Sequence, residues 1–133
     1  MPDPREILDS IGQAASQRIS TDAAQAIVSA INETGGREVF CAGTLNAGGL
    51  VVQVRVLARG HEGAVPAVFE GLKTGEVMIH NHPSGNIAPS EADLQLASIY
   101  AFYGHGVYIV DNVVTRVYVV IEPATSDPKQ KVD

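Results

Sequence analysis

The stretch EVMIHNHPSG, residues 76–85, contains the features that decide the fold. Its first half, from Val77 to His80, is apolar and rich in branched side chains, which predicts a short buried strand. Its second half ends that strand, because Asn, Pro, Ser and Gly are the residues of turns. Side chains two apart on a strand project to the same face, so His80 and His82 are placed to offer two imidazole nitrogens to one metal ion.

The residues after this loop predict a helix that supplies a third ligand. Ser90 lies three residues before Asp93 and just ahead of apolar residues at helical spacing, which is typical of a helix that begins with a capping box. The intervening loop has two prolines and a glycine and can return the chain toward the strand end. Two imidazoles and one carboxylate leave a tetrahedral position for water, as in catalytic zinc sites. Two simpler interpretations stay open, an incidental pair of histidines and an Asp93 that only caps the helix.

The remaining sequence predicts an α+β fold, in which helices pack around a mixed β-sheet within a single domain. Helical and strand periodicities alternate, and glycine-containing loops separate the segments. The expected helices begin at Pro4, run from Ser20 or Thr21 to Gly35, cover residues 65–72, and run from Ser90 to Gly104 or Gly106. The first of these has an apolar stripe of Ile7, Leu8 and Ile11. The expected strands are residues 39–46, 50–57, 76–80, 107–110 and 114–121, with a tight turn at Gly48 and Gly49.

The length of 133 residues fits one ordinary domain that folds around its own core without disulfides. We expect this domain to occupy residues 1–122. In residues 123–133, Pro, Lys, Ser and Thr replace the apolar pattern, which predicts a flexible tail or a linker to a further domain. Fusion to a larger protein, or association with one, is compatible with such a tail.

Charge and cysteine content limit the classes of function. The formal net charge is −6 and the basic residues are scattered, which disfavours direct binding of nucleic acid by this domain. Cys41 is the only cysteine, so no internal disulfide can form, and a cytoplasmic setting fits best. The sequence has no signal-peptide pattern, and no apolar run reaches the roughly 18 residues that a membrane span needs. We therefore expect no membrane association.

The pattern around the histidines resembles that of a known family. His80-Asn81-His82-Pro83, followed after seven residues by Ser90 and then by Asp93, resembles the H-x-H-x(7)-S-x-x-D core of the JAMM (MPN-plus, JAB-type) zinc metalloproteases. The string HNHPSG is similar to the RadC-like branch of that superfamily. The resemblance implies a cytidine-deaminase-like, JAMM-type domain with one zinc ion, held by His80, His82 and Asp93.

The resemblance also implies the catalytic residues. The family places a glutamate at the start of an early strand as the general base, and Glu38 has that place here, whereas Glu62, Glu70 and Glu76 do not. The serine of the motif, Ser90, is expected to help stabilise the oxyanion. For Glu38 the alternative is an exposed carboxylate without a role, and for Ser90 it is helix capping alone.

The implied activity is zinc-dependent hydrolysis of a peptide or isopeptide bond by a JAMM-type metallopeptidase. The expected substrate is a peptide or a ubiquitin-like protein, cleaved at the tail of the modifier. The alternative is a non-proteolytic, RadC-like module that associates with DNA-repair or helicase machinery. Retention of every expected ligand together with a candidate base favours the enzyme.

Overall fold

The computed structural model describes residues 12–60 and 70–124. Within them, two α-helices and a mixed β-sheet confirm the predicted α+β class. In chain order the elements are strand β1 (Gln13–Ala14), the 3₁₀ helix η1 (Ala15–Gln17), α2 (Thr21–Glu33), β2 (Val39–Leu45), β3 (Val51–Arg59), β4 (Val77–Asn81), α4 (Glu91–Phe102), β5 (Gly106–Val110) and β6 (Arg116–Ile121).

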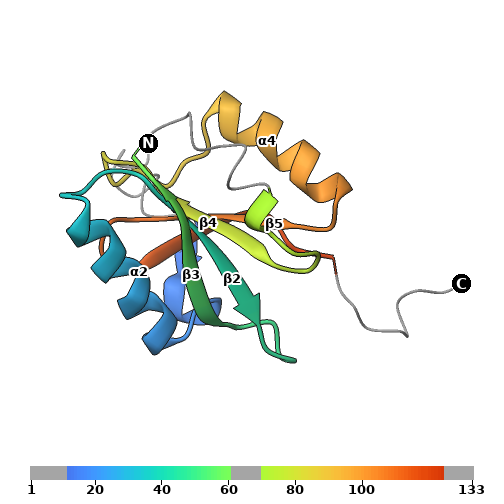
Figure 1. The fold of residues 1–133 in the computed structure, drawn as a ribbon, viewed down its shortest axis with the longest axis horizontal. Helices are drawn as coiled ribbons and strands as arrows, with labels where there is room; N and C mark the ends of the chain where they lie inside the picture. The colour runs from blue at the N-terminus through green and yellow to red at the C-terminus, as the bar shows by residue number, and fades with distance from the viewer. Residues whose placement is uncertain (1–11, 61–69, 125–133) are drawn as a thin grey trace, which may run out of the picture.

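The strands form one sheet in the order β1-β6-β5-β4-β2-β3. The central pair, β4 and β5, is parallel, and every other neighbouring pair is antiparallel. Parallel neighbours need a crossover connection, and α4 provides it between the end of β4 and the start of β5 (Figure 1). The end of β4 is therefore followed by a loop that leads directly to the first turn of α4.

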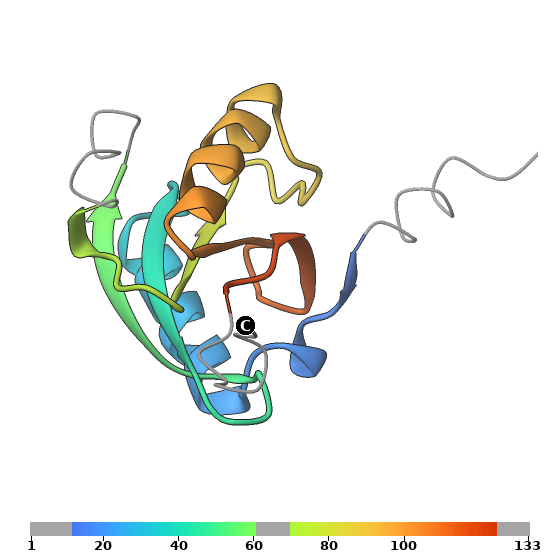
Figure 2. The ribbon, with the colours of Figure 1, turned by 90° about the vertical axis from the view of Figure 1, so that its right-hand side faces the viewer.

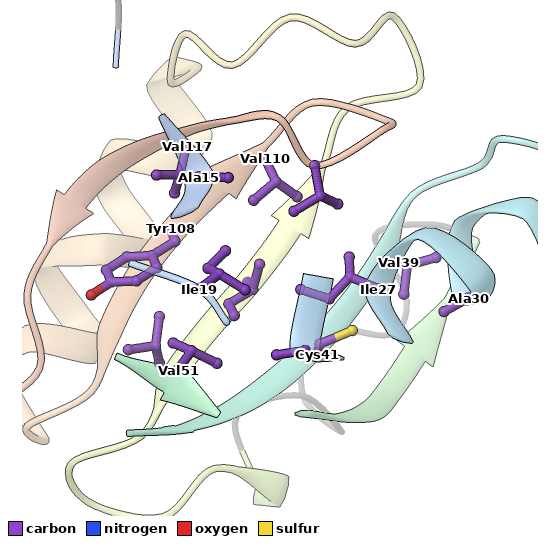
Figure 3. Close-up of a cluster of buried hydrophobic side chains, with 14 of the residues drawn as sticks. Ala15, Ile19, Ile27, Ala30, Val39, Cys41, Val51, Tyr108, Val110 and Val117 are labelled. Atoms are coloured by element: carbon purple, nitrogen blue, oxygen red, sulfur yellow. The ribbon is translucent and has the colours of Figure 1, made fainter. Parts of the chain in front are cut away.

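The two helices cover opposite faces of the sheet (Figure 1). On one face, Ile27 of α2 belongs to a buried cluster with Val39 of β2 and Ile79 of β4 (Figure 3 shows the cluster). On the other face, Tyr100 of α4 belongs to a second cluster with Phe40 of β2. Alternate residues of each central strand thus face different helices, which explains why these strands are apolar along almost their whole length.

The hairpin of β2 and β3 curves, so that its turn lies beside the segment that precedes α2 (Figure 2). Val51 N–H donates to the carbonyl of Arg18 at 2.8 Å, and Ser20 N–H donates to the carbonyl of Val51 at 2.8 Å. These bonds form a parallel bridge between Ile19 and Val51. Local sequence patterns do not predict this bridge, because it joins residues that are distant in the chain.

The predicted starts of α2 and α4 are confirmed. The Ser20 hydroxyl accepts from the third residue of its helix at 3.1 Å. Ser90 and Asp93 form the predicted capping box, in which each side chain bonds to the backbone N–H of the other residue. The expected ends also hold, since α2 stops just before Gly35 and α4 just before Gly104, both of which have positive φ.

The last strand starts later than the predicted residue 114. Asp111 explains the difference, because its carboxylate accepts from the backbone N–H groups of Thr115 at 2.7 Å and Arg116 at 3.1 Å. These bonds continue the turn through Val114, whose φ is 53°. A positive φ is unfavourable for a β-branched residue, so the surrounding contacts must hold Val114 in this conformation.

Several predictions fall outside the described residues. They are the helix at Pro4 with Ile7, Leu8 and Ile11, most of the helix at residues 65–72, and most of the tail at residues 123–133. Glu70 and Gly71, near the end of the second of these, are helical. The predicted domain limits stay predictions. No helix within residues 12–60 and 70–124 is long and apolar enough to cross a membrane.

Candidate metal centre

The two histidines leave the end of β4 on the face that α4 covers. His80 pairs with Phe40 of β2, and the same antiparallel register, continued past this last pair, places Glu38 opposite His82. Residues two apart on a strand share a face. Glu38, Phe40, His80 and His82 therefore all project toward α4, where Asp93 lies in the first turn.

Asp93 contacts both imidazoles. Its Oδ1 lies 3.0 Å from Nε2 of His80, and its Oδ2 lies 2.9 Å from Nε2 of His82. Oδ2 also accepts the backbone N–H of Ser90 at 2.9 Å. The three side chains that the sequence analysis assigned to one metal ion thus converge, although they come from a strand, a loop and a helix.

The spacing of these donor atoms suits zinc. Zinc binds imidazole nitrogen and carboxylate oxygen at about 2.0–2.2 Å, so two ligand atoms at a tetrahedral angle are about 3.4 Å apart. The observed separations of 3.0 and 2.9 Å are shorter because hydrogen bonds join the same atoms. The two contacts use different oxygens of Asp93, and all three side chains lie at the range from which they would hold one ion in place of the hydrogen-bond protons.

His82 is held in the manner of a metal ligand. Its Nδ1 lies 2.7 Å from the carbonyl oxygen of Asn86 and donates to it, which leaves Nε2 as the nitrogen that faces Asp93. A turn brings this carbonyl into place, closed by a 2.8 Å bond from the N–H of Gly85 to the carbonyl of His82. Pro83 and Gly85 suit the turn, because Pro fits its second position and Gly85 has a φ of 83°.

His80 is held differently, by packing. It is only 2% exposed, and its ring stacks on Phe40 with centroids 5.6 Å apart and an interplanar angle of 19°. Among the described residues its Nδ1 is the only buried side-chain nitrogen or oxygen without a hydrogen-bond partner. Asp93 is thus the group that orients the polar side of this ring.

The charges of the cluster are those of a ligand set. Burial alone would raise the pKa of Asp93, but the hydrogen bonds from His80, His82 and the Ser90 backbone outweigh it and hold the pKa of this carboxyl well below its usual range. The hydrogen bond to Asp93 raises the pKa of His82, against burial, and the nearby charge of Glu38 acts in the same direction. Asp93 is therefore an anion, ready to bind a cation, at neutral pH.

Glu38 completes the cluster. The possible ligand atoms of Glu38, His80 and His82 all lie within 4.8 Å of one another, which makes the three a group able to hold a metal ion. A carboxylate at this range can ligate the ion or reach a water held by it. The geometry thus brings Glu38 close to both histidines and leaves both modes of action open.

A cleft of about 480 Å³ opens beside the cluster. Glu38, His82, Ser90 and Asp93 line it together with the apolar side chains of Phe40 and Leu96. The exposed Ser90 hydroxyl accepts the N–H of Asp93 at 3.0 Å. A hydroxyl that accepts still has its own hydrogen to donate, so helix capping and a contact with substrate are compatible roles for Ser90.

Other candidates have structural explanations. Cys41 is fully buried in the core, and burial raises the pKa of its thiol to about 12. Glu76 lies at the opposite end of β4 from the histidines and binds Arg55 through both oxygens, at 2.6 and 2.8 Å. His105 is buried against Tyr100, and His61 lies outside the described residues.

Three residues of the site had no predicted role: Phe40, Asn81 and Asn86. The turn signal in HNHPSG was sufficient to predict a carbonyl that folds back toward His82. Nothing in the local pattern predicts the stacking of Phe40 on His80 or the contacts of Asn81, because both depend on how distant strands pair.

Comparisons with known proteins show the family and the fold of this chain. Residues 17–119 match the family described as the RadC-like JAB domain. Among solved structures, the chain is similar to a JAB1/MPN domain protein from Archaeoglobus fulgidus, with a TM-score of 0.50 and 20% identity over 81% of this chain and 94% of that chain. At this identity the likeness shows the fold, which is that of JAB/MPN domains. No curated protein matches the chain.

Proposed function

This chain belongs to the RadC-like JAB domain family, and from that premise we propose that it is a zinc-dependent hydrolase that cleaves a peptide or isopeptide bond. The observation that carries the proposal is the convergence of Glu38, His80 and His82 within 4.8 Å, with Asp93 in contact with both histidines. This set contains the ligands and the base that metal-assisted hydrolysis needs.

In the proposed mechanism, His80, His82 and Asp93 hold the ion. The chemistry that zinc supplies when bound is a water of lowered pKa and a Lewis acid for a carbonyl. Glu38, which lies across from His82, accepts a proton from the attacking water and later delivers it to the leaving amine. The Ser90 hydroxyl donates its hydrogen to the substrate carbonyl oxygen as negative charge develops there.

The proposed substrate is a peptide or the tail of a ubiquitin-like protein. The cleft is large enough for a few residues of an extended chain. Its wall combines the apolar Phe40 and Leu96 with the charged cluster, which suits an apolar side chain next to a scissile amide. The single, buried Cys41 supports our proposal of a cytoplasmic setting.

A second candidate is a non-proteolytic module that associates with DNA-repair or helicase machinery. The RadC-like character of the family match supports this candidate. The net charge of −6 disfavours direct contact with DNA, so such a module would act through a protein partner or a fused domain. The two candidates differ in whether peptide bonds are cleaved.

The test is cleavage of fusions in which a ubiquitin-like protein precedes a reporter peptide, with the zinc-loaded protein and with a chelator added. We expect cleavage that the chelator abolishes. Glu38→Gln should keep its zinc, by elemental analysis, and lose about 10²–10⁴-fold in turnover because it removes the base. Glu33→Gln, at an exposed carboxylate paired with Arg59, is the matched control and should retain activity.

Two results would count against this function. Full activity of Glu38→Gln would show that Glu38 is not the base. Binding of zinc without cleavage of any peptide or isopeptide fusion would favour the second candidate.

A further inference from the structure

Asn81, which lies between the two histidines, projects away from them. Neighbouring residues of a strand face opposite sides of the sheet, so Asn81 lies on the face that α2 covers. It is only 1% exposed. A buried carboxamide is costly unless its oxygen and both of its N–H groups have partners, and the partners of Asn81 lie around Glu38.

The carboxamide of Asn81 binds the backbone on both sides of Glu38. Its Oδ1 accepts the N–H of Val39 at 2.8 Å, and its Nδ2 donates to the carbonyl of Arg37 at 3.2 Å. The pairing of β2 with β4 ends at Phe40 and His80. Beyond that pair, the side chain of Asn81 supplies the hydrogen bonds to the β2 backbone. They hold the backbone next to Glu38, the proposed base.

Asn112 connects the same carboxamide to the loop after His82. The Nδ2 of Asn81 donates to Oδ1 of Asn112 at 2.8 Å, and the Nδ2 of Asn112 donates to the carbonyl of Pro83 at 3.0 Å. In this series of hydrogen bonds each N–H group meets an oxygen. A flip of either carboxamide would place its oxygen against another oxygen and its NH₂ group against another N–H group. The hydrogen bonds therefore fix both amide orientations.

The turn that presents Asn112 is itself strained. Val114, two residues later, has a φ of 53°. The carboxylate of Asp111 holds this turn through the N–H of Thr115 and that of Arg116. A backbone held in such a conformation keeps its neighbours in a defined place, which here is the position of Asn112 under the loop of the site.

We propose that Asn81 and Asn112 form a carboxamide clamp, the pair of side chains that fixes the Glu38 backbone relative to the loop of His82, and that both are positioning residues for the reaction. The inference rests on the proposed function for its catalytic meaning, while the clamp itself belongs to the metal-free protein. A general base works only when it is held within hydrogen-bond reach of the water it activates. The clamp supplies that restraint from the face of the sheet that the substrate does not touch.

The clamp is tested first without any catalysis, by hydrogen exchange of backbone amides in the metal-free protein. In Asn81→Ala the Val39 amide loses its acceptor and should exchange roughly tenfold faster or more, as for the loss of one hydrogen bond. Asn112→Ala, at a half-buried site, should accelerate the exchange of the Val39 amide to a smaller extent. The amide of Cys41, farther along β2, should keep its wild-type rate in both variants.

The second test is kinetic and uses the zinc-loaded protein. Asn112→Ala should keep one zinc per chain, lower kcat about tenfold and change KM by less than about twofold. In a Glu38→Gln background the same substitution should cause no further loss of the residual kcat, because the group it positions is already absent. Asn46→Ala is the control, since Asn46 binds the N–H groups of Gly48 and Leu50 in a distant turn.

The outcomes separate this inference from the proposed function. Wild-type exchange of Val39 in Asn81→Ala would overturn the clamp whether or not the protein is an enzyme. An equal loss of kcat with and without Glu38 would overturn the positioning role, as would loss of zinc from Asn112→Ala. Accelerated exchange in a protein that cleaves nothing would support the clamp and refute only the proposed hydrolysis.

Discussion

Asp93→Asn separates the two tasks of Asp93, helix capping and metal binding. The carboxylate accepts three hydrogen bonds, from Nε2 of His80, Nε2 of His82 and the N–H of Ser90. An amide keeps one acceptor oxygen, which can serve Ser90 and His82 together. Its NH₂ group then faces His80, so one hydrogen bond to a charged group is lost.

The size of the effect follows from burial. The Asp93 side chain is only 10% exposed, so solvent screening does little to weaken its bonds. A hydrogen bond to a charged group contributes about 1.5–3 kcal/mol. We expect the free energy of unfolding of the metal-free protein to fall by about 2 kcal/mol and its Tm by roughly 8 °C. Zinc affinity should fall more, by about 100-fold, because a neutral amide replaces the anionic ligand.

Thermal denaturation of the metal-free protein and calorimetric titration with zinc measure the two effects separately. Asp22→Asn is the matched control, because Asp22 also lies in the first turn of a helix, α2, but is exposed. It should lower Tm by no more than a few degrees and leave zinc binding intact. Wild-type zinc affinity in Asp93→Asn would refute the assignment of Asp93 as a ligand.

Two further predictions concern the surroundings of the cluster. Gly85→Ala places a side chain at a φ of 83°, which should lower the free energy of unfolding by about 1–2 kcal/mol in urea titrations. It should also weaken zinc binding, because the turn orients His82. An unchanged free energy of unfolding together with unchanged zinc affinity would contradict this account of the turn. Glu76 has its pKa lowered to about 2, chiefly by its hydrogen bonds with Arg55. A depressed carboxyl pKa stabilises the fold above the unfolded value of about 4.5, and this contribution is lost as the pH falls from there toward 2. Glu76→Gln should therefore be less stable than wild type at pH 6.5, and the difference should shrink to about a quarter of that by pH 2.5, as measured by urea denaturation. A constant difference would show that the ion pair is not the cause.

The elements of the site were predictable because their signals are local. The capping box at Ser90 and Asp93 and the strand that ends at His80 each depend on a few neighbouring residues. The convergence of these elements also followed from the sequence, since a strand, a short loop and a helix leave few ways to arrange three side chains. The structure brings these side chains together, while their roles in metal binding and catalysis stay predictions.

What the sequence did not predict depends on contacts between distant segments. Asn81 binds Arg37, Val39 and Asn112, which come from other parts of the chain. The bidentate pair of Arg55 with Glu76 joins β3 to the start of β4. These contacts require the strand order and register, which alternating hydrophobicity alone does not specify.

The late start of β6 has a related cause. Branched residues from Val113 onward predict a strand, yet the Asp111 carboxylate competes for the backbone N–H groups and keeps Val114 in the turn. A side chain that captures local backbone groups thus outweighs β propensity over two residues.

The most direct test of the central claim is X-ray absorption spectroscopy of the protein loaded with one equivalent of zinc. We predict a shell of nitrogen and oxygen donors at about 2.0–2.2 Å that includes two imidazoles, and the loss of one imidazole in His82→Ala. A spectrum without histidine scattering, or one that His82→Ala leaves unchanged, would contradict the account.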